Sequence, residues 1–189
     1  MKIKVFLFIL LLIIPCTVKG LDINSKNAIL YNLNTNEIIY EKNIDESIKI
    51  ASLTKMMTTI VALENINNLN DKVIITDKML EGLIELDASV AGFKVGDIVT
   101  YEDLLYGAML PSGADATRAL AISISGNIDD FVLLMNNKAK QLKLTNTYYT
   151  NTTGLDYKDN HSTVKDVAIL LQYALSNIAT SFTVEWLSL

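Results

Sequence analysis

Strand-like segments lie near the beginning of this chain, and helix-like segments follow almost to its end. Ala28–Leu33 and Ile38–Glu41 are mainly apolar, and the turn-rich stretch Asn34–Glu37 joins them, which predicts a β-hairpin. Two strands alone are only marginally stable and need further strands or a covering helix. The sequence therefore predicts an α+β fold whose set of strands is incomplete.

Apolar residues at helical spacing predict five helices after the hairpin. The first is largely buried, and its start falls near Ser52. The second follows a predicted N-cap at Thr100, with Asp103 three residues further on, and ends before Pro111. The predicted ranges are 51–66, 101–109, 115–123, 128–142 and 163–176, with short β-like runs at 73–75 and 97–99.

The first twenty residues have the layout of a secretory signal peptide. Two lysines precede the unbroken apolar run Val5–Ile14, and small residues follow near Gly20. That run is about half of the roughly 20 residues that a helix needs to cross a bilayer. We therefore expect a signal peptide at residues 1–20 and one mature domain at residues 21–189. An uncleaved anchor extended through Val18 is the alternative.

Composition excludes several functions. Residues 1–20 hold three of the 16 basic residues and none of the 21 acidic ones, so residues 21–189 carry a formal net charge of −8. Without a basic stripe, nucleic acid is not an expected partner. Cys16 is the only cysteine and lies in the signal peptide, so the mature chain lacks a thiol. His161 is the only histidine, so we expect no metal site and no cofactor.

Ser52 and Lys55 form a Ser-x-x-Lys at the opening of the first predicted helix. The spacing places both side chains on one helical face, about 5–6 Å apart at Cβ. Apolar neighbours make an ammonium costly, which favours the neutral amine that a general base requires. The amides of the helix N-terminus are available to a developing oxyanion. His161 lies in a polar stretch typical of a loop, so a lysine or a carboxylate is the expected base of a serine hydrolase.

The same spacing recurs at Ser162 and Lys165, in polar surroundings. There, Ser162 or Thr163 is better explained as the N-cap of the last helix, with Asp166 in its first turn. An N-cap role is also open to Ser52. Spacing alone therefore does not establish a nucleophile.

Four ordered segments resemble the low-molecular-weight penicillin-binding D-alanyl-D-alanine carboxypeptidases. They are the hairpin Ala28–Asn43, the Ser-x-x-Lys segment Ile50–Thr58, the stretch Leu104–Ala121 around Pro111-Ser112-Gly113-Ala114, and Asn146–Asp156, which ends in Thr-Gly-Leu-Asp. The resemblance covers residues 24–177. It implies a β-lactamase/transpeptidase-like α+β domain, with an antiparallel sheet backed by helices and the C-terminal strands missing.

The resemblance implies a serine-type carboxypeptidase that removes the terminal D-alanine from peptidoglycan stem peptides through an acyl-enzyme on Ser52. Lys55 would take the serine proton, and Ser112 would relay a proton to the leaving amine. Gly113 and Ala114 belong to the implied substrate-binding segment. Expected partners are stem peptides ending in D-Ala-D-Ala, with β-lactams as covalent inhibitors. The expected location is extracytoplasmic, in the cell wall or periplasm, with peripheral association with the membrane.

Two departures from the family pattern keep alternatives open. Ala114 stands where the second motif has an asparagine, and no Lys-Thr-Gly follows Ser112. We therefore expect the chain to be a truncated domain. One alternative function is a catalytically inactive homologue or wall protein that binds peptidoglycan. A β-lactamase resembles the sequence less well, because positions 113 and 114 lack Asp-Asn.

Overall fold

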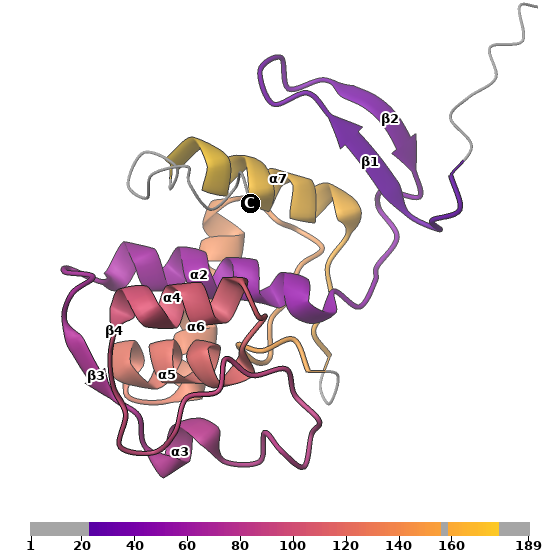
Figure 1. The fold of residues 1–189 in the computed structure, drawn as a ribbon. Helices are drawn as coiled ribbons and strands as arrows, with labels where there is room; N and C mark the ends of the chain where they lie inside the picture. Colours follow the sequence, from indigo (N-terminus) through magenta and orange to yellow (C-terminus); the bar gives the residue numbers. More distant parts are fainter. Residues whose placement is uncertain (1–22, 156–158, 178–189) are drawn as a thin grey trace, which may run out of the picture.

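The computed structural model describes residues 23–155 and 159–177 of the 189-residue chain. In this part the elements are β1 (Ala28–Tyr31), β2 (Ile38–Lys42), the 3₁₀ helix η1 (Ala51–Leu53), α2 (Thr54–Asn65), β3 (Lys72–Ile74), α3 (Asp77–Leu80), β4 (Ile98–Thr100), α4 (Tyr101–Met109), α5 (Ala114–Ser125), α6 (Ile128–Gln141) and α7 (Val164–Asn177). Figure 1 shows the β1–β2 hairpin standing beside a layered group of helices, with α7 next to it. The predicted signal peptide, including Cys16, lies outside the described residues.

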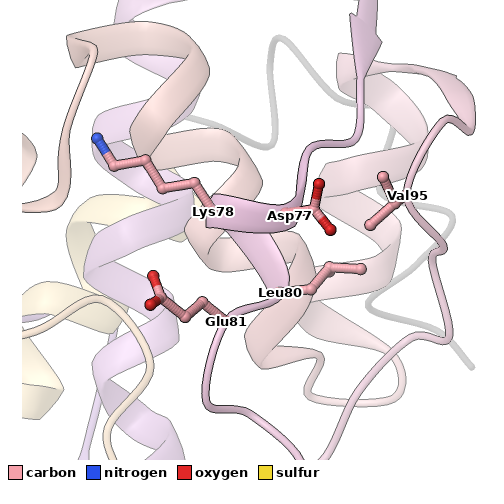
Figure 2. A pocket seen from close by; sticks show the side chains of 5 residues that line it. All are labelled: Asp77, Lys78, Leu80, Glu81 and Val95. Atoms are coloured by element: carbon pink, nitrogen blue, oxygen red, sulfur yellow. The ribbon is translucent and has the colours of Figure 1, made fainter.

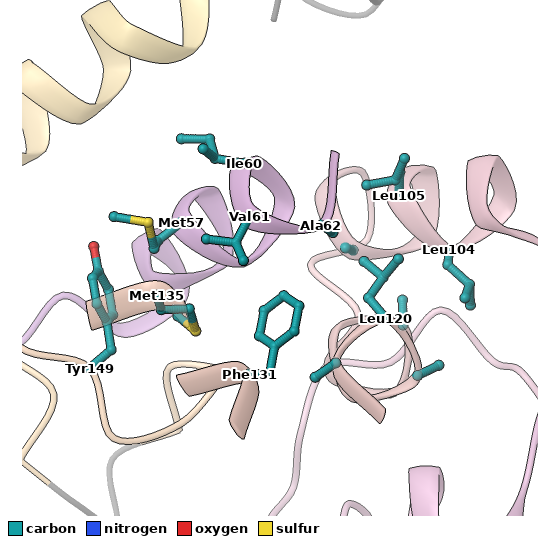
Figure 3. Packing of buried hydrophobic residues seen from close by; sticks show 14 of the residues in the cluster. Met57, Ile60, Val61, Ala62, Leu104, Leu105, Leu120, Phe131, Met135 and Tyr149 are labelled. Atoms are coloured by element: carbon teal, nitrogen blue, oxygen red, sulfur yellow. The ribbon is translucent and has the colours of Figure 1, made fainter. Parts of the chain in front are cut away.

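The hydrophobic core forms around α2, which contacts α4, α5, α6 and α7. Figure 3 shows how side chains of α2, α4, α5 and α6 meet. Fully or almost fully buried members include Met57, Ile60, Val61 and Ala62 of α2, Leu104 and Leu105 of α4, Leu120 of α5, Phe131 and Met135 of α6, and Tyr149. Close packing on several sides fixes the position of α2. The short turn that precedes α2, and contains Ser52, is therefore attached to the most constrained helix of the core.

The predicted hairpin is confirmed. β1 pairs with β2 in antiparallel register, with Ala28 opposite Lys42 and Leu30 opposite Tyr40, and a bulge follows at Tyr31. In the turn, the Asn32 side chain accepts hydrogen bonds from two following amides. β1 also contacts α7, so a helix covers part of the hairpin as its marginal stability requires.

The two short β-like runs pair with each other. β3 and β4 form a second antiparallel sheet, in which Val73 lies opposite Val99 and Ile74 opposite Ile98. Val73 is buried, whereas Ile74 and Ile98 are exposed, as alternation along a strand requires. The four-residue helix α3, between these strands, was not expected from the sequence because it is too short to show a helical period.

All five predicted helices are present: the predicted range 51–66 is η1 followed by α2, and α4, α5, α6 and α7 have ends within about two residues of the expected ones. Thr100 caps α4 as predicted: its hydroxyl accepts the Asp103 N–H at 3.1 Å, and the Asp103 carboxylate accepts the Thr100 N–H at 2.8 Å. Asn127 caps α6 through the Asp130 N–H at 2.8 Å. Within residues 23–155 and 159–177, no helix has both the length and the apolar character needed to cross a membrane.

Candidate active site

Ser52 lies in the 3₁₀ turn that leads into α2. The Leu53 N–H donates to Ile50 O at 2.9 Å, and the Thr54 N–H donates to Ala51 O, so backbone carbonyls take up these amides. The alternative of Ser52 as an N-cap is therefore wrong: α2 starts after Leu53, and no side chain caps it. Ala51, the residue before Ser52, has φ +42°, a strained conformation for a non-glycine residue.

The Ser52 and Lys55 side chains meet as their spacing predicts. Lys55 Nζ lies 3.2 Å from Ser52 Oγ and donates a hydrogen bond to it. Lys55 is only 5% exposed, and in the described part of the chain it forms no ion pair. Burial lowers the pKa of the Lys55 ammonium from its ordinary value, which favours the neutral amine. Ser52 is exposed, so the pair combines an accessible hydroxyl with a buried amine.

The loop of residues 150–155 is bound to the start of α2. The Thr58 hydroxyl, on α2, donates to Thr152 O at 2.8 Å. Asn151, which is buried, accepts the Thr153 and Gly154 amides at 3.0 and 2.7 Å and so shapes the loop from within. Gly154 then lies directly against the Ala51 carbonyl. The predicted Thr-Gly-Leu-Asp landmark is thus part of the Ser52 surroundings, although its Asp156 lies outside the described residues.

The second predicted motif forms the turn between α4 and α5. Ser112 is half-buried and has φ +59°, while Gly113 and Ala114 are buried at the start of α5. The Gly113 N–H donates to Gly107 O, and the Ala114 N–H donates to Ser89 O at 2.8 Å. Since Ala114 is 1% exposed, its methyl group faces the protein interior. The substrate-binding role expected of Gly113 and Ala114 stays a prediction.

The same packing connects the two motifs. α2 contacts both α4 and α5, the helices that flank Ser112. In Figure 1, α2 begins and α4 ends toward the same side of the helical group. In the described part of the chain, the Ser112 hydroxyl makes no hydrogen bond of its own, so its predicted role as a proton relay also stays a prediction.

Asp115 was not expected from the sequence to contribute to this site. Its buried carboxylate accepts the Ala91 N–H at 2.8 Å on Oδ1, and the Gly92 and Phe93 amides at 2.9 and 3.2 Å on Oδ2. It thereby ties the loop before β4 to the segment that contains Ser112 and Gly113. In the sequence, Asp115 has the pattern of an acidic residue in a first helical turn, which hides this contact.

The second Ser-x-x-Lys does not form a pair. Ser162 is buried with its hydroxyl 2.7 Å from that of Thr147, whereas Lys165 Nζ lies 3.1 Å from an Asp45 carboxylate oxygen. The Thr163 hydroxyl accepts the Asp166 N–H at 3.1 Å, which confirms the N-cap interpretation and selects Thr163.

The His161 imidazole forms a hydrogen bond within its own loop, where Nδ1 lies 2.9 Å from Asp159 O. In residues 23–155 and 159–177, no group of three or more histidine, cysteine or acidic side chains is arranged to hold a metal ion.

In residues 23–155 and 159–177, two of the surface hollows lie outside these motifs. One, of about 510 Å³ beside α3, is lined by Asp77, Lys78, Leu80, Glu81 and Val95 (Figure 2). A second, of about 350 Å³, is lined by residues of α2 and α6, Glu64 and Lys138 among them. Ser52, Lys55 and Ser112 line neither hollow. The candidate site is therefore defined by the contact between Ser52 and Lys55.

Solved structures with the same fold include a DD-transpeptidase and penicillin-binding proteins. The DD-transpeptidase of Streptomyces K15 superposes with a TM-score of 0.80 at 34% identity, over 85% of this chain and 64% of that one. Penicillin-binding protein 5 of Haemophilus influenzae superposes with a TM-score of 0.79 at 33% identity, over 85% of this chain and 48% of that one. The chain therefore has the α+β fold of the D,D-peptidases and transpeptidases, as predicted.

Residues 15–185 match the D-alanyl-D-alanine carboxypeptidase family, and the chain belongs to that family. D-alanyl-D-alanine carboxypeptidase DacF of Bacillus subtilis is 35% identical over 164 residues, which are 84% of this chain and 41% of DacF. DacC of Escherichia coli, also a D-alanyl-D-alanine carboxypeptidase, is 32% identical over 177 residues, which are 89% of this chain and 44% of DacC. The chain spans about two fifths of the length of these relatives.

Proposed function

We propose that this chain carries the nucleophile segment of a serine D-Ala-D-Ala carboxypeptidase. The single observation that carries the proposal is the 3.2 Å contact between the exposed Ser52 hydroxyl and the buried Lys55 amine. Membership of the family supplies the reaction class, and the names of DacF and DacC give the same activity for those relatives.

Lys55 acts as the general base in the proposed acylation step. Its neutral amine removes the Ser52 hydroxyl proton while Oγ forms a bond to the carbonyl carbon of the penultimate D-alanine of a stem peptide. The amide bond to the terminal D-alanine breaks, and its nitrogen takes a proton as it leaves. Water then hydrolyses the ester on Ser52, which regenerates the hydroxyl. Burial of Lys55 supports this role because the lowered pKa increases the fraction of neutral amine near neutral pH.

The 3₁₀ turn supports a specific donor for the oxyanion. The amides of Leu53 and Thr54 donate to Ile50 O and Ala51 O within the turn. The proposal therefore assigns the Ser52 N–H, on the nucleophile itself, to the negative oxygen of the tetrahedral intermediate. A backbone donor held in a rigid turn stabilises such an oxyanion without reorganisation.

Ser112 is the proposed proton relay toward the leaving amine. Its strained φ of +59° and the buried Gly113 after it support a position fixed by the surrounding structure. Ala114 has no amide side chain for the substrate or for Lys55. This absence favours a second candidate function, in which the protein binds stem peptides and turns them over slowly or not at all.

The proposed setting is the outer face of the cytoplasmic membrane, in the cell wall or periplasm. Export through residues 1–20 and peripheral association with the membrane belong to the proposal. The substrate is a peptidoglycan stem peptide ending in D-Ala-D-Ala. β-Lactams, which mimic that end, acylate the same Ser52.

Covalent labelling of the full chain by a fluorescent penicillin tests the proposal. We expect label on the wild type and on Ser162→Ala, which removes the serine of the unpaired Ser-x-x-Lys, and none on Ser52→Ala. Equal labelling of Ser52→Ala and Ser162→Ala would contradict the assignment of the nucleophile. Release of D-alanine from a peptide ending in D-Ala-D-Ala then separates the two functions: label with release over many turnovers indicates a carboxypeptidase, and label with no more than one equivalent released indicates an acylated, non-hydrolysing protein.

A further inference from the structure

Gly154 is in contact with the peptide group that joins Ala51 to Ser52. It has φ +78°, and a Cβ atom placed on it would lie 1.9 Å from Ala51 O, 2.5 Å from Ala51 C and 3.1 Å from Ser52 N. The first two distances are shorter than those of real Cβ contacts, and the atoms concerned are backbone. A side chain at this position is therefore excluded by space as well as by backbone conformation.

The loop that carries Gly154 is held in place from two sides. Asn151 Oδ1 accepts the Gly154 N–H at 2.7 Å and the Thr153 N–H at 3.0 Å. The Thr58 hydroxyl donates to Thr152 O at 2.8 Å and ties the same loop to α2. Because Thr58 and Asn151 are both buried, Gly154 cannot move away from Ala51 without breaking buried hydrogen bonds.

The carbonyl that Gly154 touches also closes the turn of Ser52. Ala51 O accepts the Thr54 N–H, and Ala51 has the strained φ of +42°. Moving this carbonyl would rotate the Ala51–Ser52 peptide, which directs the Ser52 N–H and, through the turn, the Ser52 side chain toward Lys55.

From this contact we infer that Gly154 is a positioning residue for the nucleophile. Its missing side chain lets the 150–155 loop fix the Ala51–Ser52 peptide, so that Ser52 Oγ stays 3.2 Å from Lys55 Nζ. This inference rests on the proposed role of Ser52. A misplacement of about 1 Å is enough to slow such a reaction by roughly 100-fold.

Two glycine-to-alanine variants separate positioning from the cost of a left-handed residue. Gly126 has φ +81° and nothing within 4 Å of a built Cβ, so Gly126→Ala carries the same conformational strain as Gly154→Ala without the clash. We expect Gly154→Ala to slow acylation by a fluorescent penicillin by about 100-fold. It should also move the pH at which the rate is half-maximal, since the contact between Ser52 and Lys55 changes. Gly126→Ala should keep the rate of acylation within about twofold of wild type and leave the half-maximal pH unchanged. Gly154→Ala and Gly126→Ala should both melt at a lower temperature than wild type.

Equal rates and pH profiles for Gly154→Ala and wild type, or equal slowing by Gly126→Ala, would overturn the inference. Should Gly154→Ala fail to fold, Thr58→Val releases the same loop without adding atoms and is expected to slow acylation by about tenfold.

Amide NMR resonances of Ser52 and Leu53 give a readout that does not depend on activity. Thr58→Val and Gly154→Ala should shift them, and Gly126→Ala should not. If penicillin does not label the wild type but the loop variants Thr58→Val and Gly154→Ala shift these resonances, the proposed function is wrong and the positioning contact is retained. If the resonances do not shift in the loop variants, the inference itself is wrong.

Discussion

Lys55 Nζ lies 3.2 Å from Ser52 Oγ, and Lys55 is buried without an ion pair in the described part of the chain. If its neutral amine is the base, the rate of acylation by a penicillin should rise with pH through one ionisation. Because burial lowers the pKa of Lys55, this ionisation should lie below the ordinary lysine value. Stopped-flow labelling across pH measures it. Lys55→Arg, which stays charged, should lose at least about 100-fold at every pH; a rate that is independent of pH would contradict the assignment.

The same burial predicts a stability cost. Because its pKa is lowered in the folded state, Lys55 binds fewer protons in the folded chain than in the unfolded chain. Its contribution to stability therefore improves as the pH rises from the lowered pKa toward the pKa of Lys55 in the unfolded chain. Below the lowered pKa the full penalty remains. Lys55→Met should therefore raise the melting temperature at pH 7 by about 2–4 °C, which corresponds to about 1 kcal/mol, while abolishing the label. A lower melting temperature for this variant would indicate that the ammonium stabilises the fold.

Asp115 should matter to the stability of the fold. Asp115→Ala leaves the amides of Ala91, Gly92 and Phe93 without their acceptor, and we expect a loss of about 2 kcal/mol in the free energy of unfolding. Asp129 is the second residue of α6, as Asp115 is of α5, but it is exposed. Asp129→Ala should cost less than about 0.5 kcal/mol in urea titrations. Equal effects would mean that the loop contact contributes nothing.

Substitution of Ala114 tests the effect of having alanine where the second motif of the family has asparagine. Ala114→Asn adds an amide at a position that is 1% exposed, so it should cost about 1–3 kcal/mol by overpacking. If the missing amide limits deacylation, the same variant should shorten the lifetime of the penicillin adduct by at least about tenfold. Ala114→Val adds bulk without hydrogen-bonding atoms and should destabilise without shortening the lifetime. An adduct equally long-lived in both variants would show that the amide is not what limits deacylation.

Thr58 and Thr59 are buried neighbours on α2, but only one of their hydroxyl groups forms a hydrogen bond in the described part of the chain. The Thr58 hydroxyl donates to Thr152 O, whereas the Thr59 hydroxyl has no partner in the described part of the chain. Thr58→Val should lower the free energy of unfolding by about 1–2 kcal/mol, because a carbonyl loses its donor. Thr59→Val should leave it unchanged or raise it. Chemical denaturation of the two variants decides, and equal losses would contradict the importance of the bond to Thr152.

Much of the fold could be predicted from local patterns. The Thr100–Asp103 capping box and the period of α2, α4, α5, α6 and α7 depend on residues close in sequence, and so do the strands of the hairpin. Such signals predict where an element begins and which face is buried. The contact between Ser52 and Lys55 was predictable for the same reason, since they are three positions apart and lie in one continuous helical stretch, Ser52 in η1 and Lys55 in the first turn of α2.

The surroundings of the site could not be predicted in this way. Asp115 bonds amides 22–24 residues earlier, and amides carry no side-chain signal. Gly154 touches Ala51 across about a hundred residues, and a glycine in the sequence indicates a turn without indicating what lies against it. The 3₁₀ turn at Ser52 lies against that distant glycine, a neighbour that spacing along the chain does not indicate.

The strained backbone at Ala51 and Ser112 has a consequence for ligand recognition. Both residues hold a left-handed conformation that isolated non-glycine residues rarely adopt, so the surrounding fold must impose it. The ordering entropy of these two segments is therefore lost when the chain folds and not when a ligand arrives. A molecule that enters the site meets a preorganised surface, and selectivity among ligands will depend on how well each one already matches that fixed shape.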